Sequence, residues 1–250
     1  MVEGTTNSRR RLPPDMKVEI WSDVACPWCY LGKRRFERAL DGFEHKSDVE
    51  LRWRSFELDP GAPPVREGDP VQRLADKYGM SRAEAVAAND RLTSFATAEG
   101  LEYHLDKLRS GNTFDAHRLL HLAADKGVQD DVKERFLRAY FTETEPIGDH
   151  AALTRVAVDA GLPADEVDDV LATDRYAEAV RADEAQAMAY GITGVPFFVL
   201  DGKFGVSGAQ SSDVLLQALR QAWAAGNPLT RLDDAGADDG GACEGDSCAV

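Results

Sequence analysis

The stretch Cys26–Cys29 reads Cys-Pro-Trp-Cys, follows a short apolar run at residues 18–21, and opens an amphipathic segment that extends to about Phe43. This order predicts a strand, a turn that carries two thiols, and a helix. Pro27 suits the first helical position, because its fixed φ fits the turn and its missing N–H would lack a helical partner there in any case. We therefore expect Cys26 at the helix cap.

Two thiols at this spacing are typical of thiol–disulfide exchange. Unpaired N–H groups and the helix dipole favour a thiolate at the cap, so Cys26 is the predicted nucleophile. Cys29 lies one turn further along, close enough to resolve a mixed disulfide formed at Cys26. The basic residues of the same helix have two interpretations: they help to hold the thiolate, or they form a solvated face, which the usual role of charged residues favours. They are Lys33, Arg34, Arg35 and Arg38.

The Cys-x-x-Cys pair has two other interpretations. It is half of a zinc site if a second pair completes it, and the remaining cysteines, Cys243 and Cys248, are the candidates. Alternatively, both thiols are inert core residues. The strand, Pro27 and helix context favours the redox pair, so we predict neither a metal nor a cofactor at this site.

A second signal is the segment Thr193–Pro196 (TGVP), which precedes the apolar run at residues 197–200. Proline cannot donate to a strand ladder, so Pro196 belongs at the start of a strand. A cis Val195–Pro196 bond would place the preceding backbone beside the active site.

The chain then continues with a tight turn at residues 201–203, a return strand at 204–207, and a helix capped by Ser211 or Ser212. Together with a strand at 49–56, this order predicts an α/β, thioredoxin-like fold with a large helical insertion and a flexible C-terminal tail.

The predicted thioredoxin-like domain combines residues 16–64 and 191–226, and the helical insertion spans 65–190. Ser81 and Glu84 predict a capping box before a helix that reaches about Ala98. Further amphipathic stretches predict helices near 114–125, 132–142, 151–160, 164–171 and 175–190. Residues 1–15 and 227–250 are predicted to be flexible. The acidic, glycine-rich tail carries Cys243 and Cys248. A flexible tail of this length reaches about 20–25 Å. We therefore hypothesise that its two cysteines form a shuttle disulfide that exchanges with the Cys26–Cys29 pair; the alternative is a separate soft-metal tail or an idle exposed pair.

Four segments resemble the FrnE-like branch of the DsbA family of thiol–disulfide oxidoreductases: SDV at 22–24 with CPWCYLG at 26–32, NTFDAHRLL at 112–120, TGVP at 193–196, and GAQ at 208–210. The resemblance implies a thioredoxin fold with a helical insertion and oxidation or isomerisation of protein disulfides. It also implies Cys26 as attacking thiol, Cys29 as resolving thiol and Pro196 as a cis proline opposite them.

Substrate contacts are predicted at Val195, whose backbone would pair with an extended peptide, and at Pro27 and Trp28 between the thiols. His117 belongs to a resembling segment and is a candidate near the cleft, although a helix histidine is more often structural. His121 follows at metal-ligating spacing, but the glutamate of the zinc-hydrolase motif is missing.

Asp23 precedes Cys26 by three residues and has two interpretations. It accepts or relays a proton during resolution by Cys29, or it hydrogen-bonds the turn.

The 250 residues are 43% hydrophobic, enough for a sizeable core, and carry a net charge of −15. This charge argues against nucleic acid or an anionic membrane as a partner. No apolar run follows the N-terminal arginines, and no stretch is long enough to span a bilayer, so we expect a cytoplasmic protein. The expected partners are protein or peptide thiols and disulfides, with glutathione or a thioredoxin-type reductant.

Three functions follow from these features. The leading one is a protein disulfide oxidoreductase or isomerase. The second is a glutathione-dependent isomerase or transferase of the kappa or 2-hydroxychromene-carboxylate type, whose NTxxAHRL-like segment this chain shares, although such enzymes generally need only one hydroxyl or thiol. The third is a non-enzymatic metal-binding stress protein that uses all four thiolates.

Overall fold

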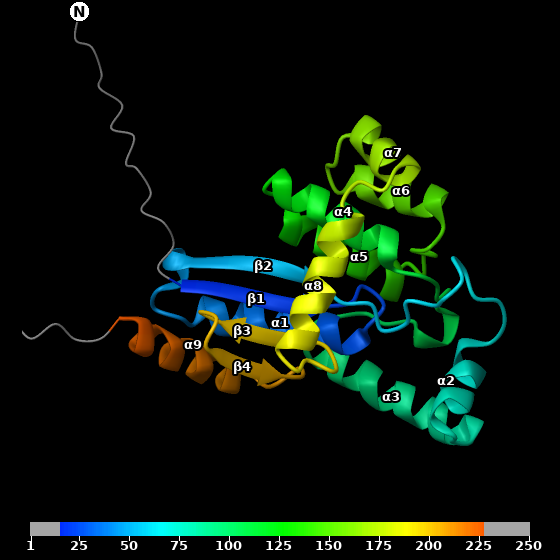
Figure 1. The fold of residues 1–250 in the computed structure, drawn as a ribbon. Coiled ribbons are helices and arrows are strands. Elements are labelled where there is room, and N and C mark those ends of the chain that lie inside the picture. The colour runs from blue at the N-terminus through cyan, green and yellow to red at the C-terminus, as the bar shows by residue number, and fades with distance from the viewer. Residues whose placement is uncertain (1–15, 228–250) are drawn as a thin grey trace, which may run out of the picture.

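The computed structural model describes residues 16–227, which form a four-stranded sheet with helices on both faces and a helical layer at one end (Figure 1). The strand order is β2-β1-β3-β4. Strand β1 (Met16–Ser22) pairs in parallel with β2 (Val49–Ser55). Strands β3 (Phe197–Leu200) and β4 (Phe204–Ser207) run antiparallel, joined by the predicted tight turn with Asp201 and Gly202 at positive φ. The predicted thioredoxin-like order of elements is confirmed.

One face of the sheet is covered by α1 (Pro27–Asp41) and α9 (Ser212–Gly226). Alternation along the strands sends Ile20 and Phe198 to this face, and Phe36 of α1 stacks on Phe198 with ring centroids 5.6 Å apart. Ser211 accepts a hydrogen bond from the Val214 N–H and is the cap of α9.

The opposite face is covered by α8 (Ala177–Ala189), which crosses the strands in Figure 1. Here Trp21 and Val199 pack with Ala187, and the Trp21 indole donates to the Asp183 carbonyl at 2.9 Å. The sheet is therefore sandwiched between the CxxC helix on one side and the last helix of the insertion on the other.

The chain leaves the sheet after β2, builds the helical layer, and returns at β3 (Figure 1). The largest core cluster lies within this layer and is centred on residues such as Leu119, Leu122, Phe136 and Leu137. The helices of this layer are α2 (Pro70–Tyr78), α3 (Arg82–Ala98), α4 (Phe114–Asp125), α5 (Gln129–Phe141), α6 (His150–Asp159) and α7 (Ala164–Ala172), with a short 3₁₀ turn at Leu105–Lys107. Another 3₁₀ turn, Lys46–Asp48, directly precedes β2.

The capping residues of the helices make the contacts that their side-chain chemistry predicts. Ser81 and Glu84 form the predicted capping box of α3, each satisfying a backbone N–H of the other. One helix, α2, is not among the predicted stretches, although Asp69 caps it, Pro70 opens it, and Gly79 ends it at φ 64°. The predicted helix at 132–142 starts earlier, at Gln129.

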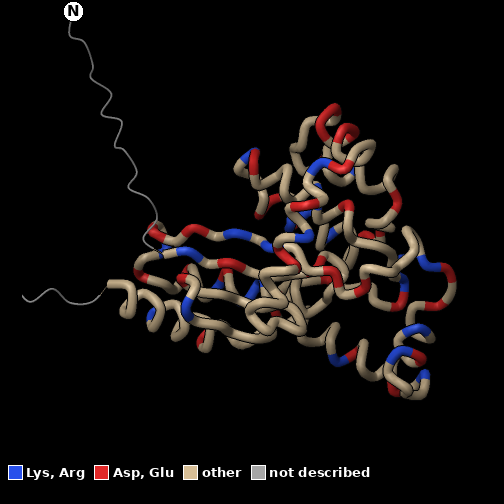
Figure 2. Tube along the Cα trace, in the orientation of Figure 1, with Lys and Arg blue, Asp and Glu red and all other residues tan. Residues whose placement is uncertain are grey.

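Charges of both signs are interspersed over the sheet with its covering helices and over the helical layer (Figure 2). Between residues 16 and 227, no helix is long and apolar enough to cross a membrane. The division of the chain into 16–64 with 191–226 and 65–190 stays a prediction. The predicted flexible ends at 1–15 and 227–250 lie, apart from residue 227, outside the described residues, as do Cys243 and Cys248.

Candidate active site

The two thiols lie where β1 turns into α1, as the sequence predicts. Cys26 is the N-cap of α1, with extended backbone at φ −93° and ψ 113°, and Pro27 opens the helix. The Cys26 N–H donates to the Asp23 carbonyl at 3.4 Å, and the Cys29 N–H donates to the Cys26 carbonyl at 3.0 Å. The turn is thus fixed by its own backbone, and it presents Cys26 at the helix start.

The Val195–Pro196 bond is cis and lies beside this turn. The Cys26 thiol donates to the Val195 carbonyl, with Sγ and O 3.6 Å apart across 169 residues of sequence. The fold therefore brings together four of the predicted site residues from opposite ends of the described chain: Cys26, Cys29, Val195 and Pro196.

Gly32 lets α1 approach the proline closely. A Cβ at residue 32 would lie 2.8 Å from Pro196 Cγ, a distance that real Cβ contacts do not reach. We expect Gly32→Ala to lower the free energy of unfolding by about 1–3 kcal/mol, because the ring or the helix must move. Urea unfolding checks this. Gly42→Ala is the matched control, since its Cβ would meet only ordinary contacts, 3.5 Å at the closest; equal losses in both variants would contradict the prediction.

Both cysteines are buried: the residue exposure is 4% for Cys26 and 0% for Cys29. The hydrogen bond to Cys29, burial, and the charges of Cys29 and Asp23 raise the pKa of Cys26 well above its ordinary value, although the Cys29 N–H opposes this. The sequence analysis considered only the effect of the helix start on the ionisation of Cys26. In the structure, burial and neighbouring groups also affect it, and they oppose the helix start. A charge on the neighbouring sulfur disfavours ionisation of Cys26, so this thiol is harder to ionise here than at an isolated helix start.

Between the thiols, Trp28 is 42% exposed and packs against Phe95 of α3, with ring centroids 6.1 Å apart. The Pro27 carbonyl accepts a 2.7 Å hydrogen bond from the Tyr103 hydroxyl. The Pro-Trp pair is thereby held by the helical layer, with an aromatic surface left open next to Cys26.

Asp23 and His117 meet in the interior behind the turn. The Asp23 carboxylate accepts from the Ala25 N–H at 3.3 Å and the Leu58 N–H at 2.8 Å. His117 is 1% exposed, and its Nε2 lies 3.4 Å from Asp23 Oδ1 without hydrogen-bond alignment. Burial raises the pKa of Asp23, but His117 and the two N–H donors outweigh it and lower that pKa overall.

His121 lies apart from the thiols. Its Nε2 is 3.2 Å from Ser55 Oγ and 3.1 Å from Asp183 Oδ2. Both neighbours share one ring nitrogen, so the three side chains do not form a hydrolase-type relay, in which serine and aspartate bind opposite ring nitrogens.

The prediction of a solvated basic face on α1 is wrong. Lys33 is buried and contacts Glu37, Asp130 and Glu134; Arg34 pairs with Glu37 and Glu134. Arg35 pairs with Glu99 at 2.9 Å, and only Arg38 is largely exposed. These charges are used to dock α1 onto the helical layer.

Lys133 of α5 is a buried residue near the site that the sequence motifs do not reveal. Its burial could have been predicted from helical spacing, because Lys133 shares a helix face with Phe136, Leu137 and Tyr140, all of which are buried. A lysine on an otherwise apolar stripe was the available signal.

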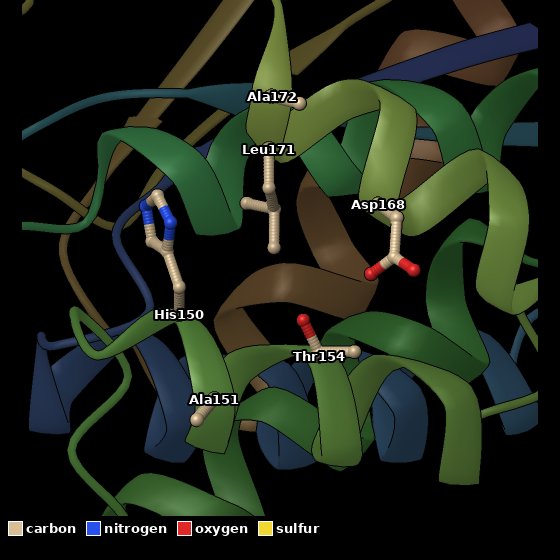
Figure 3. Close-up of a pocket in the computed structure, with 6 residues that line it drawn as sticks. All are labelled: His150, Ala151, Thr154, Asp168, Leu171 and Ala172. Carbon is tan, nitrogen blue, oxygen red and sulfur yellow. The ribbon is translucent and has the colours of Figure 1, made fainter.

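A cavity of about 450 Å³ lies elsewhere, in the helical layer (Figure 3). It is lined by His150, Ala151, Thr154, Asp168, Leu171 and Ala172. None of the predicted site residues lines it. Across residues 16–227, no group of three or more His, Cys, Asp or Glu side chains is arranged to hold a metal ion.

Comparison with known proteins identifies this arrangement. Residues 17–220 match the model of the DsbA-like thioredoxin domain. The chain belongs to this family. A probable DsbA oxidoreductase of Streptomyces coelicolor has a similar structure, with 49% identity, a TM-score of 0.82, and coverage of 94% of this chain and 99% of that one. The resemblance to the DsbA family is thus confirmed, and the protein is a thiol–disulfide oxidoreductase.

Two further similarities are more limited. The uncharacterized protein YwbO of Bacillus subtilis is 30% identical over 206 residues, covering 81% of this chain and 94% of YwbO. A 2-hydroxychromene-2-carboxylate isomerase has 14% identity and a TM-score of 0.60, with 84% of this chain and 97% of that one covered. At that identity the second similarity shows a common fold only.

Proposed function

We propose that this DsbA-family enzyme exchanges disulfides in protein or peptide substrates, with Cys26 as nucleophile and Cys29 as resolving thiol. The observation that carries the proposal is Cys26 at the start of α1, 3.6 Å from the Val195 carbonyl and beside Cys29. The four segments of this chain that resemble the FrnE-like branch lie close to this point of the fold, which supports assignment to that branch.

In the reductive direction, the Cys26 thiolate attacks a substrate disulfide. One substrate sulfur bonds to Cys26, and the other leaves as a thiolate. The Cys29 thiolate then attacks Cys26, the bond from Cys26 to the substrate breaks, and two electrons have passed to the substrate as Cys26–Cys29 forms. Oxidation of a substrate is the reverse sequence. In isomerisation, a different substrate thiolate attacks the substrate sulfur bonded to Cys26, a new substrate disulfide forms, and Cys26 leaves as a thiolate.

Burial supports this order of attack. Cys26 retains some exposure at the turn, whereas Cys29 has none. A substrate sulfur therefore reaches Cys26 and not Cys29.

Substrate would lie across Trp28, Pro27 and Val195. The exposed Trp28 ring offers an apolar contact, and an extended peptide pairs with the backbone at Val195, which limits sequence selectivity. His117 is too deeply buried to touch a peptide. We propose that it acts behind Asp23, and that a proton leaving Cys29 passes to the Asp23–His117 pair.

We further propose a cytoplasmic setting, with glutathione or a thioredoxin-type reductant as electron partner. A reducing compartment makes a disulfide of this kind catalytic rather than structural. The tail cysteines Cys243 and Cys248 are proposed as a shuttle pair that exchanges with Cys26–Cys29.

The glutathione-dependent isomerase remains the second candidate, since a 2-hydroxychromene-2-carboxylate isomerase shares the fold. Two adjacent thiols argue for exchange instead, because such isomerases generally need one hydroxyl or thiol to hold glutathione.

One experiment separates the two functions. The metal-free protein is equilibrated in graded glutathione buffers, free thiols are trapped, and disulfides are mapped by mass spectrometry. We expect a reversible Cys26–Cys29 disulfide with a potential of roughly −120 to −270 mV. Mixed disulfides with Cys243 or Cys248 would support the shuttle. A stable glutathione adduct at Cys26 without an internal disulfide would overturn exchange in favour of the isomerase class.

A further inference from the structure

Two exposed aromatic rings lie beside the nucleophilic thiol. Trp28, which stands between Cys26 and Cys29, is 42% exposed, and Phe95 of α3 is 47% exposed. The two ring centroids are 6.1 Å apart, and the ring planes are inclined by 42°. We call this pair of rings the Trp28–Phe95 surface. Aromatic side chains stabilise a protein mainly by burying their area, so two half-exposed rings in contact leave apolar area for a partner to cover.

Phe95 is held in place by the residues that follow it on α3. Ala96 is fully buried and belongs to the core cluster of the helical layer. One turn after Phe95, the Glu99 carboxylate pairs with Arg35 at 2.9 Å and with Arg38 at 2.7 Å, both on α1. The end of α3 is therefore fixed against the helix that carries the thiols, and its core-facing position is already filled. A ring fixed in this way loses little conformational entropy when a partner binds.

The partner that covers the Trp28–Phe95 surface follows from the chemistry at Cys26. During exchange a substrate sulfur bonds to Cys26, so the substrate chain must lie over the residues that border this sulfur. One of them is Val195, whose side chain packs on the core cluster that contains Trp21. Val195 thus contributes its backbone, which does not select among side chains. Trp28 is another border of the sulfur, and its ring is open to a substrate side chain.

The geometry of an extended peptide specifies which side chain this is. Side chains alternate between the two faces of an extended chain, so those on the same face as the reacting cysteine are two residues away, roughly 6–7 Å along the chain. We infer that the Trp28–Phe95 surface is a specificity subsite of the exchange reaction, and that it binds a large apolar side chain two residues from the substrate cysteine.

The inference rests on the proposed exchange function and names its substrate class. Trp28 belongs to the redox motif itself, whereas Phe95 comes from the helical insertion and enlarges the apolar area beside it. Phe95 is therefore the residue that makes the subsite selective for large apolar side chains over small polar ones. The preferred substrates are peptides and protein segments that carry such a side chain at this position.

The test compares two disulfide-linked peptide dimers, one of Leu-Gly-Cys-Gly-Leu and one of Ser-Gly-Cys-Gly-Ser, as substrates of the pre-reduced enzyme. In each reaction the thiols of Cys26 and Cys29 become a disulfide, and the peptide disulfide becomes two thiols, which chromatography counts. We expect the wild type to reduce the leucine dimer about tenfold faster than the serine dimer, because only leucine buries apolar area on the rings. Phe95→Ala should remove most of this preference. Cys26→Ser gives the background from other thiols.

Two further variants isolate the subsite. Val86→Ala removes another exposed apolar side chain of α3, about 14 Å from Phe95 along the helix axis, and should keep the wild-type preference. Phe95→Leu keeps an apolar side chain and should retain most of the preference. Thermal unfolding verifies that each variant is folded.

The other outcomes separate the subsite from the exchange function. Equal losses for both dimers in Phe95→Ala would show that Phe95 only supports Trp28, and they would overturn the inference. Loss of the preference in Val86→Ala would overturn it as well, because the effect would then belong to α3 as a whole. If the wild type forms no Cys26–Cys29 disulfide with either dimer, the proposed function fails; if it reduces both dimers at equal rates, only the subsite inference fails.

Discussion

Cys26→Ser should abolish disulfide exchange, with a loss on the order of 10³-fold or more, as expected when the attacking group is removed. A serine hydroxyl does not ionise under conditions where a thiolate forms, and Cys29 is fully buried and cannot substitute for Cys26. Reduction of insulin by dithiothreitol, followed by turbidity, measures the reductive rate, and refolding of a scrambled disulfide protein measures isomerisation.

Cys29→Ser is the matched variant, one helical turn away. It should retain attack by Cys26 but fail to resolve the product, so a mixed disulfide with substrate accumulates and is seen by mass spectrometry. Serine at either position adds no bulk, so we expect both variants to fold as the wild type does. If Cys26→Ser kept the activity and Cys29→Ser lost it, the assignment of the two thiols would be reversed.

The fold was predictable because its decisive signals are local. Pro27 after Cys26, the Asp201–Lys203 turn, and the Ser81 capping box each fix a helix end or a hairpin through groups a few residues apart. The boundary at Gln129 was missed because the first turn of α5 carries polar residues, and the apolar pattern begins only at Val132. Packing on β2 determines that turn, and the side chain of Gln129 bonds both the N–H and the carbonyl of Trp53.

The site was predictable only in part. The thiols and Pro196 lie in motifs, but what surrounds them comes from long-range contacts. The burial of Lys133 and the docking of Arg34 on Glu134 depend on how α5 lies against α1, which no local pattern specifies. A basic helix face has the same sequence pattern whether it is exposed to water or pairs with carboxylates of a distant helix.

Arg54 ties the sheet to the helical insertion, and its loss should be the most damaging single charge removal. It donates to Glu19 of β1 at 2.8 Å and to Asp183 of α8 at 2.7 Å. All three side chains are largely buried. Arg54→Met would remove the cation that the two buried carboxylates share and leave Glu19 with Lys17 and Asp183 with His121. We expect this to cost about 3–5 kcal/mol and to lower Tm by on the order of 10 °C.

The pH dependence of stability identifies this mechanism. Burial raises the pKa values of Glu19 and Asp183, but Arg54 and their other partners outweigh it and hold both below their ordinary 4.5 and 3.8. The unfolded chain therefore binds more protons in acid, so the stabilisation is fully present above about pH 5 and is lost as the pH falls through the folded values. In Arg54→Met this loss becomes smaller, so the difference from wild type, measured by urea unfolding from neutral pH to about pH 3, should shrink. Arg52→Met, on the same strand, is the control and should cost less than about 1 kcal/mol at every pH. Arg54 also lies over the Trp21 ring, 5.9 Å from its centroid. A constant loss of stability for Arg54→Met across this pH range would therefore assign its effect to lost packing on Trp21 rather than to charge.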